Sequence, residues 1–358
     1  MFTPKIPVTA QTTAPVLSLR PVAHWLWICA GMVFAMAIIG AITRLTESGL
    51  SIVEWNPIGG TLPPLHDAEW QRLFAEYQKT PQYLQINQGM SLAEFKGIFW
   101  WEWIHRFWGR LIGVVFALPL LWFAVTRRVK GGLLLKLLGL FLLGGLQGGI
   151  GWFMVASGLV NEPSVSHYRL ALHLGFAIFL MALLVYTALS VGETRHASQM
   201  PRAAQGLRGQ VRFTFVLLAI TVVWGAFVAG LDAGRIYNEF PYMGDSRLFP
   251  EEGLQMQPVL RNFVENHATV QFTHRWLALT TAFFTLLLGI ELLRNPNVSA
   301  RARNLGAALM GMVCVQVALG IVTLLTNVHI HPAVSHQGGA LVLVGLMTAL
   351  VYELRGRK

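Results

Sequence analysis

The sequence has few charged side chains. Asp, Glu, Lys and Arg make up 12% of its 358 residues, hydrophobic residues make up 54%, and the mean hydropathy is +0.53. A typical soluble domain has about 25% charged residues. A soluble protein with one very large core is disfavoured, because the polar interruptions are short and regularly spaced. A lipid bilayer is therefore the expected solvent.

Cysteine is also scarce, and the two residues present, Cys29 and Cys314, both fall within apolar stretches. Disulfides and CxxC redox pairs are therefore not expected. The N-terminal tail lacks a short apolar core followed by a small-residue cleavage site, and it is not Arg-rich and Ser-rich as a mitochondrial leader is. We therefore expect a bacterial inner-membrane protein without a removable signal peptide.

Long apolar runs are what the sequence has in abundance. A helix needs roughly 20 apolar residues to cross a hydrocarbon core of about 30 Å. The sequence predicts an all-α integral membrane protein with eight transmembrane helices, at 24–44, 105–126, 132–156, 168–191, 212–231, 272–294, 304–325 and 334–354.

The net charge of +10 would suggest a nucleic-acid partner for a soluble protein, but its distribution indicates a membrane topology. Basic residues concentrate before the first span, after every second span and at the C-terminus. The positive-inside rule then places both termini and the short basic loops in the cytoplasm. The long loops 45–104 and 232–271 are expected outside, and membrane lipid rather than nucleic acid is the expected surrounding partner.

The two halves of the sequence resemble each other. Matching features follow in the same order: Gly40–Gly49 and Gly225–Gly234, His105-Arg106 and His274-Arg275, Gln147 with Gly151 and Gln316 with Gly320, and Val165-Ser-His167 and Val334-Ser-His336. Each unit has an even number of spans, so the repeat is parallel, with a pseudo-twofold axis along the membrane normal. This predicts two tandem four-helix bundles, 24–191 and 212–354, with a cytoplasmic tail at 1–23 and a basic cytoplasmic linker at 192–211.

Histidines within the apolar spans are the most informative residues. Ionisable groups are costly there and usually face the bundle interior in a functional role. Two facing imidazoles can hold a haem iron from opposite sides, so each half is predicted to hold one haem near the outer face. A hydrogen-bonded packing role remains the alternative for a single histidine. The four candidates are His105, His173, His274 and His336.

Zinc or copper would require three or four clustered nitrogen or sulfur ligands, and no carboxylate or cysteine joins the histidines in both halves. Haem needs only two ligands, and its propionates suit the paired hydrogen bonds of an arginine. For any one arginine, snorkelling to lipid phosphate is the alternative. The candidate propionate partners on the outer side are Arg106, Arg110, Arg169 and Arg275.

The fourth span contains two candidate ligands. The ungapped repeat aligns His167 with His336, whereas His173 lies six residues deeper in the span. Spacing alone leaves both alternatives open.

Glu102 breaks the symmetry between the halves. It stands three residues before His105, where the second half has Gln271 before His274. If one helix includes both residues, Glu102 and His105 lie on the same face, about one turn apart. A carboxyl group beside one haem only suits a catalyst better than an electron carrier, so Glu102 is predicted to be catalytic. The alternative is an interfacial glutamate paired with Arg106.

Taken together, these motifs resemble the haem A synthase family. Their order and spacing agree from about residue 24 to 354. The motifs are Gly40–Ser51, Glu102–Arg106, Tyr168–Gly175, Thr273–Arg275 and Val334–Gln337. The outer loops lack the cysteine pairs found in part of that family, so the chain looks like its proteobacterial and mitochondrial branch.

The resemblance implies oxidation of the C8 methyl group of haem O to a formyl group, giving haem A for cytochrome oxidase. It implies that the N-terminal half holds the substrate haem on His105 and His173, and so favours His173 over His167. The C-terminal half would hold a haem b cofactor on His274 and His336, and Glu102 would be essential. Haem O synthase and cytochrome oxidase assembly factors are the implied partners, while the electron acceptor and a homo-oligomeric state are left open.

Two other classes of protein share some of these features. A di-haem b membrane cytochrome that only moves electrons also predicts two haems, but it needs no acid at Glu102 and keeps both haems permanently. A repeat-built transporter would need broken helices at mid-membrane, whereas the polar groups here cluster near one face.

Overall fold

The computed structural model describes residues 18–56, 59–159, 163–192, 205–245 and 247–355. Most of the predicted tail at 1–23 and residues 193–204 of the predicted linker lie outside this part of the chain. Within the described residues the secondary structure is helical, with no strand. Eight of the described helices are long and apolar enough to cross a membrane, which confirms the predicted all-α membrane fold.

The eight long helices agree with the predicted spans to within several residues, with one larger difference. They are α1 (Arg20–Leu45), α4 (Leu92–Val125), α5 (Gly131–Gly158), α6 (His167–Gly192), α7 (Gln205–Gly230), α9 (His267–Arg294), α10 (Ala300–Leu325) and α11 (Ile330–Glu353). Helix α4 begins at Leu92 rather than near residue 105. Its start is set by a capping box, in which Glu94 N donates to Ser91 Oγ (3.3 Å) and Ser91 N donates to Glu94 Oε2 (2.8 Å). The predicted loop 45–104 is therefore shorter, because residues 92–104 continue the helix.

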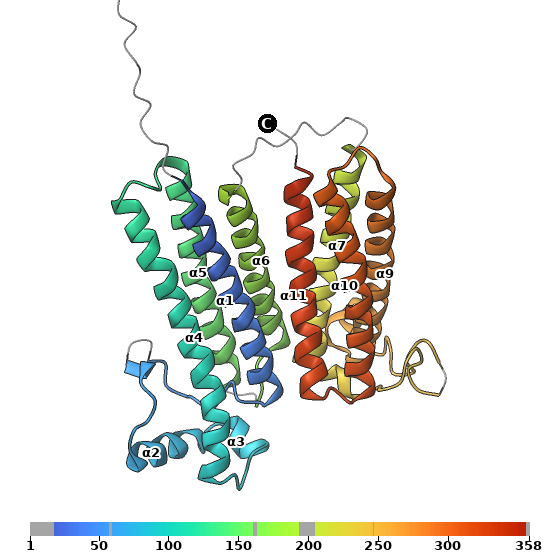
Figure 1. Cartoon of the computed structure of the whole chain (residues 1–358). Helices are drawn as coiled ribbons and strands as arrows, with labels where there is room; N and C mark the ends of the chain where they lie inside the picture. The colour runs from blue at the N-terminus through green and yellow to red at the C-terminus, as the bar shows by residue number, and fades with distance from the viewer. Residues whose placement is uncertain (1–17, 57–58, 160–162, 193–204, 246, 356–358) are drawn as a thin grey trace, which may run out of the picture.

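The long helices fall into two groups that lie side by side. Figure 1 shows α1, α4, α5 and α6 on one side and α7, α9, α10 and α11 on the other; we call these the first and second groups. Between the groups, α1 contacts α11, α6 contacts α7, and α6 contacts α11. Two polar links cross the same boundary: Gln337 Nε2 on α11 donates to the Ala37 carbonyl on α1 (2.6 Å), and Arg44 pairs with Asp232 (2.8 Å).

Buried side chains form two large apolar clusters. One lies within the first group and includes Trp25, Leu26 and Phe116. The other covers the second group and also takes in Ala37 of α1 and Met181 of α6. Close packing of this kind associates helices in a bilayer, where lipid is as apolar as the side chains. The second cluster therefore helps to hold the two groups together.

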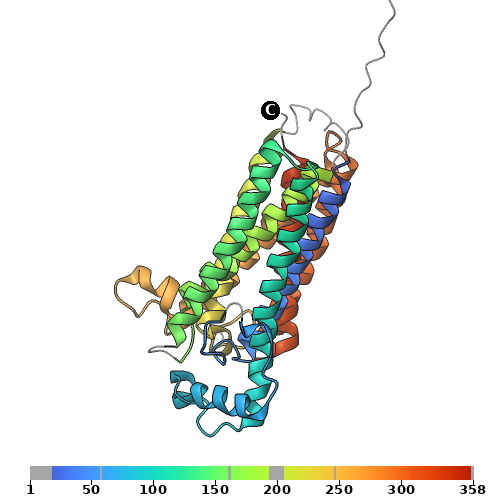
Figure 2. The ribbon, with the colours of Figure 1, turned by 90° about the vertical axis from the view of Figure 1, so that its left-hand side faces the viewer.

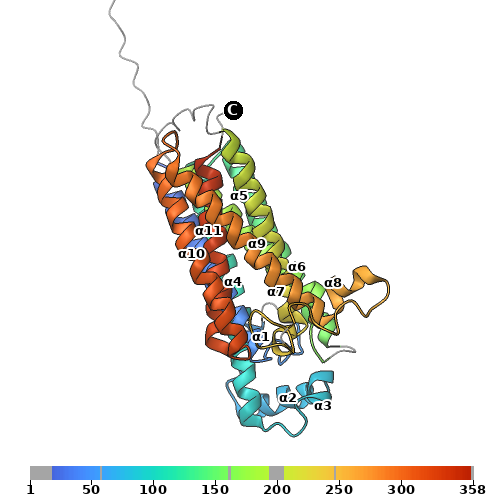
Figure 3. The same cartoon turned by 90° about the vertical axis from the view of Figure 1, so that its right-hand side faces the viewer.

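The non-membrane segments gather at one end of the helices, which we call the loop end. Figures 1, 2 and 3 show it opposite the end where α1 begins and α11 finishes. Before α4 the loop end carries η1 (Gly59–Thr61), α2 (Asp67–Tyr77) and α3 (Pro81–Gln85), and before α9 it carries η3 (Ala233–Arg235), η4 (Val259–Arg261) and α8 (Asn262–Glu265). Trp70 and Tyr77 of α2 pack against Phe95 and Phe99 of α4, so the early start of α4 supports the first of these segments.

Candidate functional site: four histidines on four glycines

Each predicted ligand histidine packs against a glycine on a neighbouring helix. A Cβ added to the glycine would lie about 3 Å from the imidazole Cε1 in every case: Gly40 to His105 (3.1 Å), Gly151 to His173 (2.9 Å), Gly225 to His274 (3.0 Å) and Gly320 to His336 (2.9 Å). Ordinary carbon–carbon contacts are about 3.5–4.0 Å. Any larger residue would push the ring away, so these glycines allow the imidazoles to lie directly on the helix backbone.

A glutamine one turn before the glycine holds two of the histidines. On α5, Gln147 Nε2 donates to the main-chain carbonyl of His173 (3.0 Å) and lies 3.2 Å from its Nδ1. On α10, Gln316 Nε2 makes the same contacts with His336, at 2.9 and 3.1 Å. His173 therefore has, in the first group, the surroundings that His336 has in the second.

His167 lies elsewhere. It is the first residue of α6, and its ring packs against Tyr168 (4.0 Å between ring centres) and against Phe227 of α7 (5.8 Å). Six more residues separate Gly151 from His173 than separate Gly320 from His336. The ungapped repeat alignment is therefore wrong in space for this segment, because the connection between α5 and α6 is longer than the one between α10 and α11.

The second group brings its two histidines face to face. The ring centres of His274 and His336 are 6.5 Å apart, with an interplanar angle of 88°. Two metal–imidazole bonds of about 2 Å each and about 1 Å from each nitrogen to its ring centre, given ring bonds of about 1.3–1.5 Å, would place two axial imidazoles about 6 Å apart. The spacing therefore fits one iron between the rings.

In the described part of the chain, no three or more His, Cys, Asp or Glu side chains come together as a metal site. The candidate metal ligands are therefore the two histidine pairs. Cys29 on α1 is buried and Cys314 on α10 is exposed, and both are free thiols.

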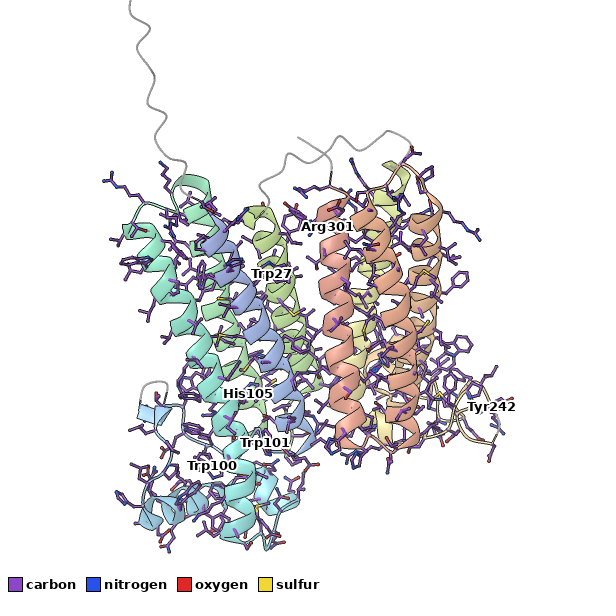
Figure 4. All side chains as sticks on the ribbon, viewed as in Figure 1. Trp27, Trp100, Trp101, His105, Tyr242 and Arg301 are labelled. Carbon is purple, nitrogen blue, oxygen red and sulfur yellow. The ribbon has the colours of Figure 1, made fainter. Side chains whose placement is uncertain are left out.

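The two remaining histidines differ in what faces Nδ1. His274 Nδ1 lies 3.2 Å from the Thr221 carbonyl of α7. An Nδ1–H that donates to this carbonyl leaves Nε2 free to bind a metal. His105 lies on α4, above Trp101 and Trp100 in Figure 4. Its Nδ1 is buried and has no hydrogen-bond partner among the described residues.

Glu102 lies in α4 with His105, as the predicted single face requires, and it is buried. Its Oε2 accepts hydrogen bonds from Ser51 Oγ and Ile52 N, both at 2.7 Å. Its Oε1 accepts one from Arg106 Nη2 at 2.6 Å. The carboxylate therefore holds the chain where it leaves α1, and the pairing with Arg106 that the sequence left as an alternative is present.

Gln271 occupies the matching place in α9, but it donates hydrogen bonds to the loop-end segment where Glu102 accepts them. Its Nε2 donates to the carbonyls of Ala233 (2.7 Å) and Tyr237 (3.2 Å), and its Oε1 accepts from Arg275 Nη2 (2.8 Å). Donors surround both oxygens of the acid in the first group, whereas the Nε2 of the amide in the second faces two carbonyl acceptors. Each residue type is thus matched to its surroundings.

Arg106 and Arg275 make the same contacts in the two halves. Arg106 donates to the carbonyls of Ile52 (2.7 Å) and Glu54 (3.0 Å). Arg275 donates to the corresponding carbonyls of Tyr237 and Glu239, both at 2.9 Å. We call each such set an arginine bracket, since it fastens a loop-end segment to a helix. The Nε of Arg275 is buried without a partner among the described residues, so one donor on this side chain is available to a carboxylate.

The other two predicted propionate partners also reach main-chain carbonyls. Arg110 Nη2 donates to Asn56 O at 3.0 Å. Arg169 Nη1 donates to Phe153 O at 2.7 Å, and its guanidinium lies 3.9 Å above the Phe153 ring. All four arginines therefore stabilise local structure, and propionate binding stays a prediction for each.

Sequence reasoning identified the histidines but not the residues that position them. The repeat marks Gly40, Gly151, Gln147 and their counterparts as matching pairs, but it does not indicate that they contact the histidines. Their recurrence at the same offset within a helix was the available signal. Main-chain partners such as the Thr221 carbonyl leave no such signal, because every residue has a carbonyl.

Comparison with known proteins places this arrangement in context. Residues 23–348, from α1 into α11, match the profile of a family described as cytochrome oxidase assembly protein. Three similar proteins are named haem A synthase: one from Rhodospirillum centenum, 54% identical over 94% of this chain and 89% of its own length; one from Nitrosospira multiformis, 47% identical over 94% of each; and one from Granulibacter bethesdensis, 48% identical over 94% and 87%.

Proposed function

Since this chain belongs to the haem A synthase family of cytochrome oxidase assembly proteins, we propose that it converts haem O to haem A by oxidising the C8 methyl group to a formyl group. It is thus an enzyme that acts on haem, and we assign it to the oxidoreductases. One observation carries the proposal. Each half has two histidines whose rings pack against glycines of neighbouring helices, and among the described residues only one half has a glutamate beside them.

We assign the substrate haem to His105 and His173 and a haem b cofactor to His274 and His336. The spacing of His274 and His336 supports the cofactor assignment, as does the unpartnered Nε of Arg275, which a propionate would satisfy. The shared glutamine and glycine contacts support His173 rather than His167. Bound haem b would supply a route for the electrons removed from the substrate.

The reaction consists of two successive hydroxylations of the methyl carbon, followed by loss of water to leave the aldehyde. We propose that Glu102 acts in this oxidation rather than in binding haem, because the matching position of the cofactor half is the amide Gln271. Its carboxylate is held by Ser51, Ile52 and Arg106. A charge fixed in a site of low dielectric can stabilise positive charge that develops at the reacting carbon.

We place the protein in a bacterial inner membrane with its loop end facing the periplasm. Basic residues at the opposite end of the described helices support this, among them Arg127, Arg128 and Lys130 after α4 and Arg301 and Arg303 in the first turn of α10. Both haems then lie towards the periplasmic side. Haem O synthase would supply the substrate within the same membrane, and factors that assemble cytochrome oxidase would collect the product.

Haem analysis of a complemented strain tests the proposed function. The gene would be expressed in bacteria that make haem O but lack their own haem A synthase, and haems extracted from the membranes would be separated by chromatography. We expect haem A, and none from cells without the gene or with His274→Ala. A folded protein that binds haem in both groups yet leaves only haems B and O would favour the di-haem electron carrier instead.

A further inference from the structure

His105 and His274 occupy matching positions in the two halves, yet they are held differently. Both rings lie on a glycine, Gly40 or Gly225. The Nδ1 of His274 also has the Thr221 carbonyl at 3.2 Å. The Nδ1 of His105 is buried and has no partner among the residues that the structure describes.

A pair of threonines ties the helices together beside His274. Thr221 Oγ1 on α7 lies 2.7 Å from Thr281 Oγ1 on α9, and it also bonds to the Leu217 carbonyl of its own helix (2.8 Å). Side-chain hydroxyls form such bonds between helices within membranes. The tie holds α7 against α9 at the level where the Thr221 carbonyl meets His274.

The first group has no hydroxyl pair at this level, and its two helices are joined there by Trp108 Nε1 of α4, which donates to the Met32 carbonyl of α1 (2.9 Å). By the repeat, Met36 of α1 stands where Thr221 does, and Ile112 of α4 stands where Thr281 does. Neither side chain can form the hydroxyl pair. The Met36 Cε reaches Gly109 of α4 instead, 3.4 Å from the position of an added Cβ. This contact is apolar and flexible, and His105 Nδ1 stays without a hydrogen-bond partner among the described residues, whereas His274 Nδ1 has one.

The other two histidines are held alike. Gln147 contacts the carbonyl and Nδ1 of His173 as Gln316 contacts those of His336. Within the described chain, all four rings pack against a glycine, but His105 is the one whose Nδ1 has no hydrogen-bond partner on another residue. Outer partners of this kind orient a metal-bound histidine, and removing one typically weakens metal binding about 10–100-fold. The Thr221 carbonyl accepts from Nδ1–H of His274, and the glutamines hold His173 and His336 by donating to their main-chain carbonyls.

We propose that His105 is the releasable ligand of the substrate haem and that His173 is its anchor. This inference rests on the proposed function, in which the haem of the first group arrives as a substrate and leaves as a product, while that of the second group stays. On release the bond between iron and His105 Nε2 breaks, its electron pair remains on the nitrogen, and the iron keeps its oxidation state. One axial position then opens while His173 retains the haem.

Carbon monoxide is a direct probe of this open position. The purified full-length protein, carrying both haems, would be reduced and exposed to carbon monoxide, and absorption spectra would show which haem binds it. We expect binding at the haem of the first group and none at haem b. A wild-type protein in which neither haem binds carbon monoxide, or in which only haem b does, would overturn the proposal.

Alanine variants test the same asymmetry without an added ligand. His105→Ala should retain the substrate haem in a high-spin form, with at least tenfold more haem per protein than His173→Ala. His274→Ala and His336→Ala form the matched control pair and should lose haem b to a similar extent, because both residues are held. Equal loss in the first pair, or greater loss from His105→Ala, would show that His105 is not the weaker ligand.

Identifying the extracted haems distinguishes failure of the proposed function from failure of the releasable-ligand proposal. If the wild type holds two permanent haems b and never haem O or haem A, the proposed function itself fails. If haem O and haem A are present but His105 and His173 behave alike, only the releasable ligand is wrong.

Discussion

At the scale of single residues, Glu102 and Gln271 show how one position in a repeat acquires two chemistries. Both precede a candidate ligand histidine by three residues, and both accept a hydrogen bond from the arginine that follows that histidine. The acid faces the hydroxyl of Ser51 and the amide N–H of Ile52, whereas the amide faces two carbonyls. The difference between the halves thus extends to the backbone around each side chain.

Glu102→Gln should abolish or strongly reduce haem A formation while haem b stays bound. The amide oxygen can still accept from Ser51 and Ile52, but its NH₂ group then faces the Arg106 guanidinium, so a buried donor loses its partner. We expect the free energy of unfolding to fall by about 1–3 kcal/mol. Haem chromatography and thermal unfolding measure the two effects.

Ser51→Ala is the matched control for this variant. It removes one hydrogen bond to Glu102 and leaves the negative charge in place, so haem A formation should persist. Glu102→Gln with a near wild-type yield of haem A would show that the acid is not catalytic.

His167→Ala should leave the haem content of both groups unchanged. Its ring packs between α6 and α7 against Phe227, so we expect reduced thermal stability rather than loss of haem. The ratio of each haem to protein, measured beside His173→Ala, decides the matter. Loss of substrate haem from His167→Ala alone would mean that the ungapped repeat identified the ligand after all.

At the scale of helices, hydropathy predicted the spans well because crossing a bilayer demands a long apolar run. It placed the start of α4 too late, since the residues from Leu92 to Ile104 form a helix for reasons other than membrane crossing. The Ser91–Glu94 capping box and the packing of Phe95 and Phe99 on α2 determine that start. The capping sequence was readable, but the partner helix was not.

The candidate ligand residues could be proposed from the sequence, but the residues that hold them in place could not. A histidine in an apolar span is rare enough to be noticed, and the repeat matched His105 with His274, as the structure does, but matched His336 with His167 rather than His173. It failed at His167 because it takes no account of connection length. The release proposed for His105 depends on the absence, among the described residues, of a main-chain partner such as the Thr221 carbonyl, which no residue type reveals.

Glycine-to-alanine changes in α5 and α10 should distinguish an effect of contact with the histidine ring from a general effect of alanine on the helix. In Gly151→Ala and Gly320→Ala the new Cβ lies 2.9 Å from a histidine Cε1, so the ring must move and haem retention should weaken about 10–100-fold at that site. Gly148→Ala and Gly311→Ala are matched controls on the same helices, because an added Cβ meets nothing within 4 Å. These controls should retain both haems. Equal losses in all four variants would contradict the interpretation that Gly151 and Gly320 make room for the histidine rings.

At the scale of the whole molecule, α11 serves both groups of helices through adjacent residues. His336 faces Gln316 of α10, and the next residue, Gln337, donates to the Ala37 carbonyl of α1 in the other group. Consecutive positions on a helix are about 100° apart, which allows one helix to meet two neighbours.

Gln337→Leu should weaken the association of the groups while both haems stay bound. A hydrogen bond between membrane helices contributes about 0.6–2 kcal/mol, and we expect a loss of this size in thermal unfolding of the protein in lipid nanodiscs. Ser335→Ala changes the exposed residue on the other side of His336 and should have no effect. Unaltered stability in Gln337→Leu would mean that this bond does not hold the groups together.

The pairing of helices between the groups bears on the origin of the chain. If α1 corresponds to α7 and α6 to α11, the contact of α1 with α11 maps onto that of α7 with α6, and the contact of α6 with α11 maps onto itself. Such self-complementary pairing defines the interface of a symmetric homodimer. An ancestral four-helix protein could thus have formed this interface with its own copy. Fusion of two duplicated genes would then have joined subunits that already fitted, and it would have allowed the two proposed haem sites to diverge in role.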